Sequence, residues 1–187
     1  NSRRSFIKTG LALATGAIIA PNAYAKESYH TLFSDSFNKR ISLQSICIFT
    51  KCLQYLDYGQ LAQTLAEAGY NGADLSVRDG GHIQPENVKT DLPRLVKILQ
   101  NAGISTPMIV TSIIDAKDKY TESILAVAAE MGIQYYRMGY LNYDKTKTIP
   151  QNIDILKRSF ESLEKLNRKC GIHGAYQNHS GTRVGAP

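Results

Sequence analysis

From about residue 41 onward, short apolar runs alternate with longer segments whose apolar residues recur every three or four positions. The short runs have the length and composition of strands, and the longer segments have the spacing of amphipathic helices. The pattern therefore predicts five strands, over residues 41–48, 72–77, 106–112, 133–140 and 172–178.

Four helices are predicted between these strands, and glycines mark where they end. They cover residues 58–68, a segment that closes at Gly103, a segment that stops at Gly132, and residues 151–170. In the second helix we expect Asp91 to be the N-cap and Pro93 to lie in the first turn.

Strand starts recur at intervals of roughly 30 residues, which is the length of a strand–helix–strand unit with parallel strands. Two α/β architectures accept this pattern. A flavodoxin-like open sheet needs only five strands and would be complete. A (β/α)8 TIM barrel needs about 250 residues, so the chain would contain only about the first five of its strands.

Polar positions within two predicted strands favour the barrel. Asp74, Ser76 and Arg78 share one face of the second strand, and Gln177 and His179 share one face of the fifth. An open parallel sheet covered by helices on both sides is usually apolar on both faces. A barrel, in contrast, builds its active site from polar residues at the carboxyl ends of its strands.

The N-terminus has the features of a twin-arginine signal peptide. Residues 3–8 read RRSFIK, a weakly apolar stretch follows over residues 11–20, and Ala23-Tyr24-Ala25 matches a signal peptidase site. We therefore expect a signal at 1–25, a polar linker at 26–40 and the N-terminal part of a barrel domain at 41–187. The protein would be periplasmic or otherwise exported by the twin-arginine route.

Net charge and hydropathy exclude two classes of partner. Arg3, Arg4 and Lys8 carry three of the six net positive charges, which leaves +3 interspersed over the rest. No clustered basic surface for nucleic acid is therefore expected. The apolar stretch at 11–20 is well short of the roughly 20 residues that span a bilayer, so we expect no stable membrane span after signal cleavage.

The three cysteines, Cys47, Cys52 and Cys170, form no CxxC pair and are too few for a disulfide scaffold. We interpret them as buried thiols that act as small hydrophobic residues.

Four motifs, in order and in register with the predicted strands, resemble the sugar phosphate isomerase/epimerase family of xylose isomerase-like TIM barrels. They are Gly72-Ala73-Asp74-Leu75, the loop 78–87, Arg137-Met138-Gly139-Tyr140 and Tyr176-Gln177-Asn178-His179-Ser180-Gly181. The resemblance implies a barrel with a divalent metal (Mn, Zn, Co or Mg). It also implies metal-assisted proton transfer next to a carbonyl group.

One position departs from the family pattern. The family has a metal-binding, proton-moving glutamate at the end of the fifth strand, where this chain has Gln177. Glutamine can offer a carbonyl oxygen to a metal, but it cannot act as a base. Gln177 is therefore expected as a metal ligand only, and His179 as the catalytic residue. An elimination reaction or a loss of catalysis remain alternatives.

Four more residues are expected to bind substrate: His82, Arg137, Tyr140 and Asn178. Each of the first three also has a structural interpretation. His82 could cap its own loop, Arg137 could pair with Asp74 inside the barrel, and Tyr140 could pack at the rim.

The sequence thus predicts an exported isomerase or epimerase, or a lyase, that acts on a small polyhydroxylated carbonyl compound such as a sugar or polyol. A non-catalytic sugar-binding barrel is one alternative, motivated by Gln177. An apurinic-endonuclease-like hydrolase shares the fold, but the export signal and the low charge of the mature chain disfavour it.

Overall fold

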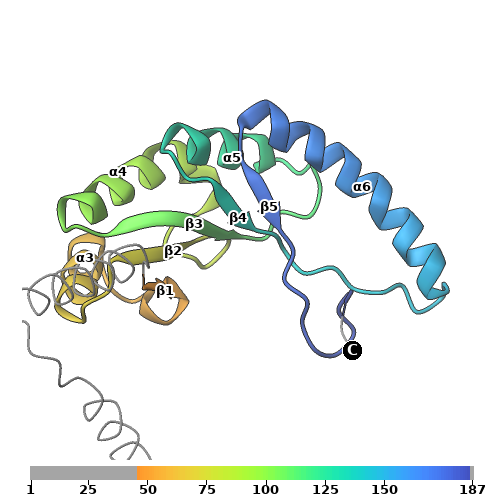
Figure 1. The fold of residues 1–187 in the computed structure, drawn as a ribbon, viewed down its shortest axis with the longest axis horizontal. Coiled ribbons are helices and arrows are strands. Elements are labelled where there is room, and N and C mark those ends of the chain that lie inside the picture. The colour runs from red at the N-terminus through yellow and green to blue at the C-terminus, as the bar shows by residue number, and fades with distance from the viewer. Residues whose placement is uncertain (1–45, 186–187) are drawn as a thin grey trace, which may run out of the picture. The chain divides into compact units, whose positions relative to one another are not determined.

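The structure is a computed structural model that describes residues 46–185. Five strands form one parallel sheet (Figure 1). They are β1 (Cys47–Phe49), β2 (Gly72–Val77), β3 (Ser105–Thr111), β4 (Tyr135–Arg137) and β5 (His173–Ala175). The expected signal, the linker and the first residues of the predicted 41–48 strand lie outside the described residues.

The helices return the chain from the end of one strand to the start of the next. They are α3 (Tyr58–Glu67), α4 (Val88–Asn101), α5 (Thr121–Glu130) and α6 (Ile149–Cys170), with short 3-10 turns η1 (Thr50–Leu53) and η2 (Pro85–Asn87). Each helix packs against the next one in sequence, and Figure 1 shows α4, α5 and α6 along the same side of the sheet.

The strand order separates the two architectures that the sequence left open. The order is β1-β2-β3-β4-β5, so every strand pairs with its neighbours in the chain. A flavodoxin-like sheet has the order 2-1-3-4-5 and carries helices on both faces. A sequential, all-parallel order with the helices on one side is that of a β/α barrel, so the flavodoxin-like alternative is wrong.

The core lies between the sheet and the helices. Leu75, Ile109 and Tyr136, from three neighbouring strands, are fully buried against helix residues such as Leu95 and Leu125. Removing these side chains from water supplies the main driving force for docking the helices on the sheet, at about 1.5–3 kcal/mol for each large apolar residue.

One polar contact crosses this core. The Tyr136 hydroxyl of β4 donates a hydrogen bond to Asn167 Oδ1 of α6 at 3.0 Å, and burial raises the pKa of Tyr136 to about 12. Because both groups are buried, the bond satisfies them and fixes the register of α6 on the sheet.

Helix α6 carries defined caps at both ends. Thr148 and Gln151 form a capping box at its start, and Gly171 ends it at φ 72°, a left-handed conformation that glycine adopts without steric cost. The helix begins at Ile149, two residues before the predicted start.

The predicted start of α4 is wrong. Asn87, and not Asp91, is the N-cap residue, and Pro93 lies inside the helix. The helix follows directly from η2, and its first residue, Val88, is buried in the core. Burial of Val88 in this extra turn outweighs the hydrogen bond that Pro93 cannot donate.

Strands β4 and β5 are shorter than predicted, because the chain leaves the sheet soon after Arg137 and Ala175. The predicted burial of the thiols is also wrong for Cys52, which is exposed, whereas Cys47 and Cys170 are partly buried. Among residues 46–185, no helix combines the length and apolar character needed to cross a membrane.

Candidate functional site

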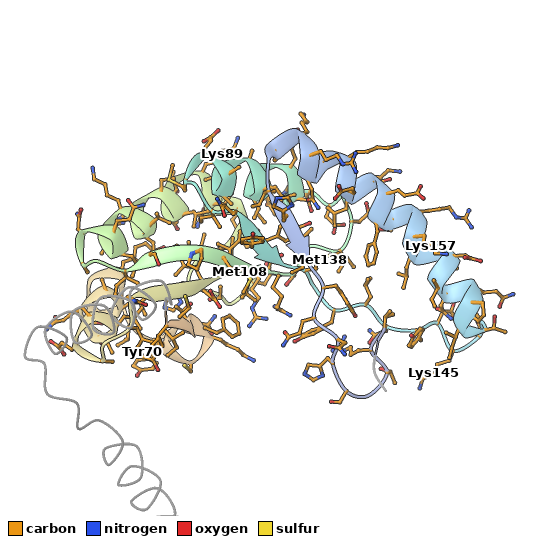
Figure 2. The ribbon with its side chains drawn as sticks, viewed as in Figure 1. Tyr70, Lys89, Met108, Met138, Lys145 and Lys157 are labelled. Carbon is orange, nitrogen blue, oxygen red and sulfur yellow. The ribbon has the colours of Figure 1, made fainter. Side chains whose placement is uncertain are left out.

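A hollow of about 440 Å³ opens on the face of the sheet that the helices do not cover. Its floor follows from the strand register: Asp74 pairs with Met108, and Val110 pairs with Arg137, which pairs with Ala175. These side chains alternate with the buried ones of the core and therefore point to the opposite face. Figure 2 shows Met108 at the sheet and Lys89 on the outer side of the helix layer.

Cations outnumber carboxylates among the described residues that line this hollow. Lys51, Arg78 and Arg137 line it, and Asp74 is the single acid. Burial raises the pKa of Asp74. No ion pair joins Asp74 to Arg137 within residues 46–185, so the internal pair considered from the sequence is not present there.

Arg137 is the most buried charged residue of the site, with 9% of its surface exposed. Its Nε and Nη1 atoms are buried without a hydrogen-bond partner among the described residues. The guanidinium lies 4.7 Å from the centre of the Tyr140 ring. Burial lowers the pKa of Arg137, the Tyr140 hydroxyl opposes that shift, and the positive charge of Arg78 adds to it.

Tyr140, Gln177 and His179 form one connected wall. The Tyr140 hydroxyl donates to Gln177 Oε1 at 3.2 Å, and the His179 ring meets the Tyr140 ring edge-on at 4.9 Å. His179 Nδ1 lies 3.3 Å from the Ser180 carbonyl oxygen. The predicted catalytic residue, the predicted metal ligand and two predicted substrate contacts are thus brought to one hollow.

Gly139 allows this wall to form. It follows β4 by two positions, and its amide donates to the Ile113 carbonyl at 2.8 Å. A Cβ at this position would lie 2.5 Å from the Ser112 carbonyl oxygen, which is too close for any side chain. The close approach of the two backbones directs the next residue, Tyr140, into the hollow.

His82 and Asn178 do not line the hollow. His82 Nε2 lies 3.1 Å from the Leu53 carbonyl, and the His82 backbone N–H donates to Ser76 Oγ at 3.1 Å. Burial lowers the pKa of His82. This histidine ties the loop after β2 to η1, a structural role that differs from the capping of its own loop considered from the sequence. Asn178 is exposed and alternates with Gln177 and His179.

Sequence reasoning missed Lys51 as a site residue, and it named Arg78 only as part of a polar strand face and of a motif. Arg78 directly follows the predicted 72–77 strand, and Lys51 lies three residues after the end of the predicted 41–48 strand. The rule that barrel sites gather at the carboxyl ends of strands was a sufficient signal for both.

The residues that the structure describes do not fit a divalent metal site by themselves. No group of three or more His, Cys, Asp or Glu side chains is close enough to hold an ion within residues 46–185. Gln177 Oε1 already accepts a hydrogen bond, and the cations of the hollow repel a metal ion.

Comparison with known proteins gives matches in structure alone. No protein-family model and no curated protein matches the sequence. The probable 3-DHS dehydratase from Bacillus anthracis aligns over 74% of this chain and 54% of its own, at 12% identity and a TM-score of 0.58.

Two further structures give similar values. The IolI protein, solved with a binding zinc atom, aligns over 71% of this chain and 51% of its own, at 14% identity and a TM-score of 0.55. The 3-keto-D-glucoside 4-epimerase from E. coli aligns over 69% of this chain and 54% of its own, at 12% identity and a TM-score of 0.52.

The chain spans about half the length of each of these structures. At such low identity the likeness shows the fold alone. The described residues have the fold of xylose isomerase-like TIM barrels, and the fold predicted from the sequence is confirmed.

Proposed function

We propose that this protein is an exported sugar isomerase or epimerase that moves a proton next to a carbonyl group of a small polyhydroxylated compound. One observation carries the proposal: Arg137, Tyr140, Gln177 and His179 gather in a single hollow at the carboxyl ends of the strands. That edge is where barrels of this fold perform chemistry. Neighbours with the same fold include a sugar epimerase and a dehydratase.

His179 is the proposed proton carrier. In the tautomer whose Nδ1–H donates to the Ser180 carbonyl, Nε2 holds a free lone pair and can accept a proton. His179 is exposed and lines the hollow, so a substrate can reach it. A positioned histidine is the usual general base for abstraction of a proton near neutral pH.

Gln177 and Tyr140 are the proposed orienting residues. Gln177 has no titratable group, and its Oε1 accepts a hydrogen bond from the Tyr140 hydroxyl. Its Nε2 has no acceptor among residues 46–185 and can donate to a hydroxyl or carbonyl oxygen of the sugar. Two residues with fixed donors and acceptors hold a sugar in one orientation relative to His179.

A divalent metal is part of the proposal only for a longer chain. Such an ion would stabilise negative charge on the substrate oxygens. Support comes from the zinc atom of IolI, not from the described residues of this chain. We propose that strands β1 to β5 are the first five of an eight-stranded barrel and that the missing ligands follow them. Export by residues 1–25 remains a proposal based on the sequence.

The test is a screen of ketoses, keto-sugars and inososes for isomerised, epimerised or dehydrated products. It should use full-length protein, before and after EDTA treatment and metal readdition. Product formation supports the proposal, and loss of turnover with EDTA supports the metal. No product from any substrate class would contradict the enzymatic assignment.

Gln177 also favours a second candidate, a sugar-binding barrel without catalysis. Here titration calorimetry would show sugar binding with no turnover. Turnover gained by a Gln177→Glu variant would then show that the absent carboxylate is the reason.

A further inference from the structure

We propose that the substrate of this site carries an anionic group, a carboxylate or a phosphate, which Arg137 binds together with Arg78 and Lys51. The inference rests on the proposed function in taking the ligand to be a sugar. It adds that the sugar is an acid or a phosphate ester.

The first argument is the charge of the hollow. Three cationic side chains and one carboxylate line it. None of the three cations forms an ion pair with a described residue. Like charges gathered around one cavity repel each other, so the arrangement is stabilised by an anion bound among them.

The second argument is the state of Arg137. Arg137 has 9% of its surface exposed, and its Nε and Nη1 atoms are buried without a hydrogen-bond partner among residues 46–185. The side chain therefore carries a desolvation cost that a bound anion would offset. Nearly all buried polar groups in folded proteins have a hydrogen-bond partner, so these atoms require one, such as a water molecule, an ion or a ligand. Asp74 does not satisfy Arg137, because no ion pair connects them.

The third argument is pre-organisation. The Tyr140 ring lies 4.7 Å from the Arg137 guanidinium, and the Phe49 ring lies 5.8 Å from that of Arg78. Both arginines are thus held by aromatic faces and not by acids. The planar guanidinium fork matches the oxygens of a carboxylate or phosphate. Lys51 is exposed at the edge of the hollow and adds a flexible third charge.

The experiment compares three ligands that differ only at carbon 6: D-glucose, D-glucuronate and D-glucose 6-phosphate. Titration calorimetry on the full-length protein should show tighter binding of one charged sugar than of glucose. Arg137→Gln should weaken binding of that sugar by about 10- to 100-fold, because the variant loses a charge-assisted hydrogen bond to the anionic group. Binding of glucose should change little.

Two further variants keep the inference testable if Arg137→Gln fails to fold. Lys51→Gln changes an exposed residue and should weaken binding of the charged sugar by a smaller factor. Arg158→Gln removes an equal charge from the exposed surface of α6, outside the hollow, and should leave binding unchanged.

Preference for glucuronate identifies a carboxylate ligand, and preference for glucose 6-phosphate identifies a phosphate ligand. Equal binding of all three sugars, or equal weakening by Arg158→Gln, would overturn the inference while leaving the proposed function intact. If a charged sugar binds and no substrate is turned over, the result supports this inference and contradicts the proposed enzymatic function.

Discussion

At the scale of single residues, His179 carries the proposed chemistry. It is exposed in the hollow, and its Nδ1 is engaged by the Ser180 carbonyl, which leaves Nε2 for the substrate. His173 belongs to the same strand region but lies at the opposite end, 5.7 Å from the Tyr135 ring. His173 can therefore serve as the control position for substitutions of His179.

We predict that His179→Gln lowers kcat by at least about 100-fold, since a positioned acid–base group contributes that much. Sugar affinity should change only a few-fold, because binding depends mainly on other residues. His173→Gln should retain wild-type kcat. Steady-state kinetics on both variants checks this, and equal losses in the two would show that the effect is structural.

His82 is predicted to make stability depend on pH. Its pKa is lowered by burial in the folded protein, whereas the unfolded chain has a value of about 6.5. The unfolded state therefore binds a proton more readily, so stability is present above about pH 6.5 and is lost as pH falls through the lower folded value.

Urea unfolding at about pH 7.5 and about pH 5.5 measures this effect. The urea concentration at the unfolding midpoint should fall further for the wild-type protein than for His82→Gln when the pH is lowered. A variant with the same pH dependence as wild type would exclude His82 as the source.

Residue types, together with the alternation of side chains along a strand, predicted part of the site. Gln177 and His179 share a strand face in the sequence, and they line the hollow in the structure. His82 could not be assigned in the same way, because its partners are backbone groups of η1, and sequence patterns do not show where a 3-10 turn will fold back.

At the scale of elements, the exit of β4 is the segment on which the site depends most. The chain passes so close to β3 that a Cβ on Gly139 would meet the Ser112 carbonyl at 2.5 Å. The contact is with backbone and cannot be relieved by a rotamer change.

Gly139→Ala is therefore predicted to destabilise the protein by about 1–3 kcal/mol and to displace Tyr140. Gly59→Ala is the control, because it sits in α3 with only an ordinary 3.4 Å contact. Alanine there should be neutral or stabilising by up to about 1 kcal/mol. Thermal unfolding of both variants tests the contrast, and equal effects would contradict it.

Element order was predictable because apolar periodicity reflects burial. Every described strand and α-helix was expected, whereas the 3-10 turns η1 and η2 were not. Element ends were less predictable. The start of α4 shows why: Asp91 and Pro93 are local signals of a helix start, but burial of Val88 extends the helix by another turn. Tertiary packing overrode local preference.

At the scale of the whole molecule, the repeat length alone could not decide between an open sheet and a barrel. Both use strand–helix–strand units of the same size. The sequential order of the five strands decides it, and that order depends on contacts between distant segments. The polar face that favoured the barrel in the sequence is the face that carries the hollow.

The chain spans about half of the barrels that it resembles, so the described hollow is one wall of the proposed site. The central claim is that the residues of this hollow transfer a proton from the carbon next to a carbonyl group of the substrate. It differs from simple sugar binding, which the same residues could support, in requiring exchange of a carbon-bound proton with solvent.

The most direct measurement follows that proton. Full-length protein is incubated in D₂O with the sugar that binds best, and ¹H NMR records the signal of the carbon next to the carbonyl. The account predicts loss of this signal with wild-type protein and its retention with His179→Gln. Sugar binding without exchange, turnover with the proton retained, or exchange undiminished in His179→Gln would contradict the account.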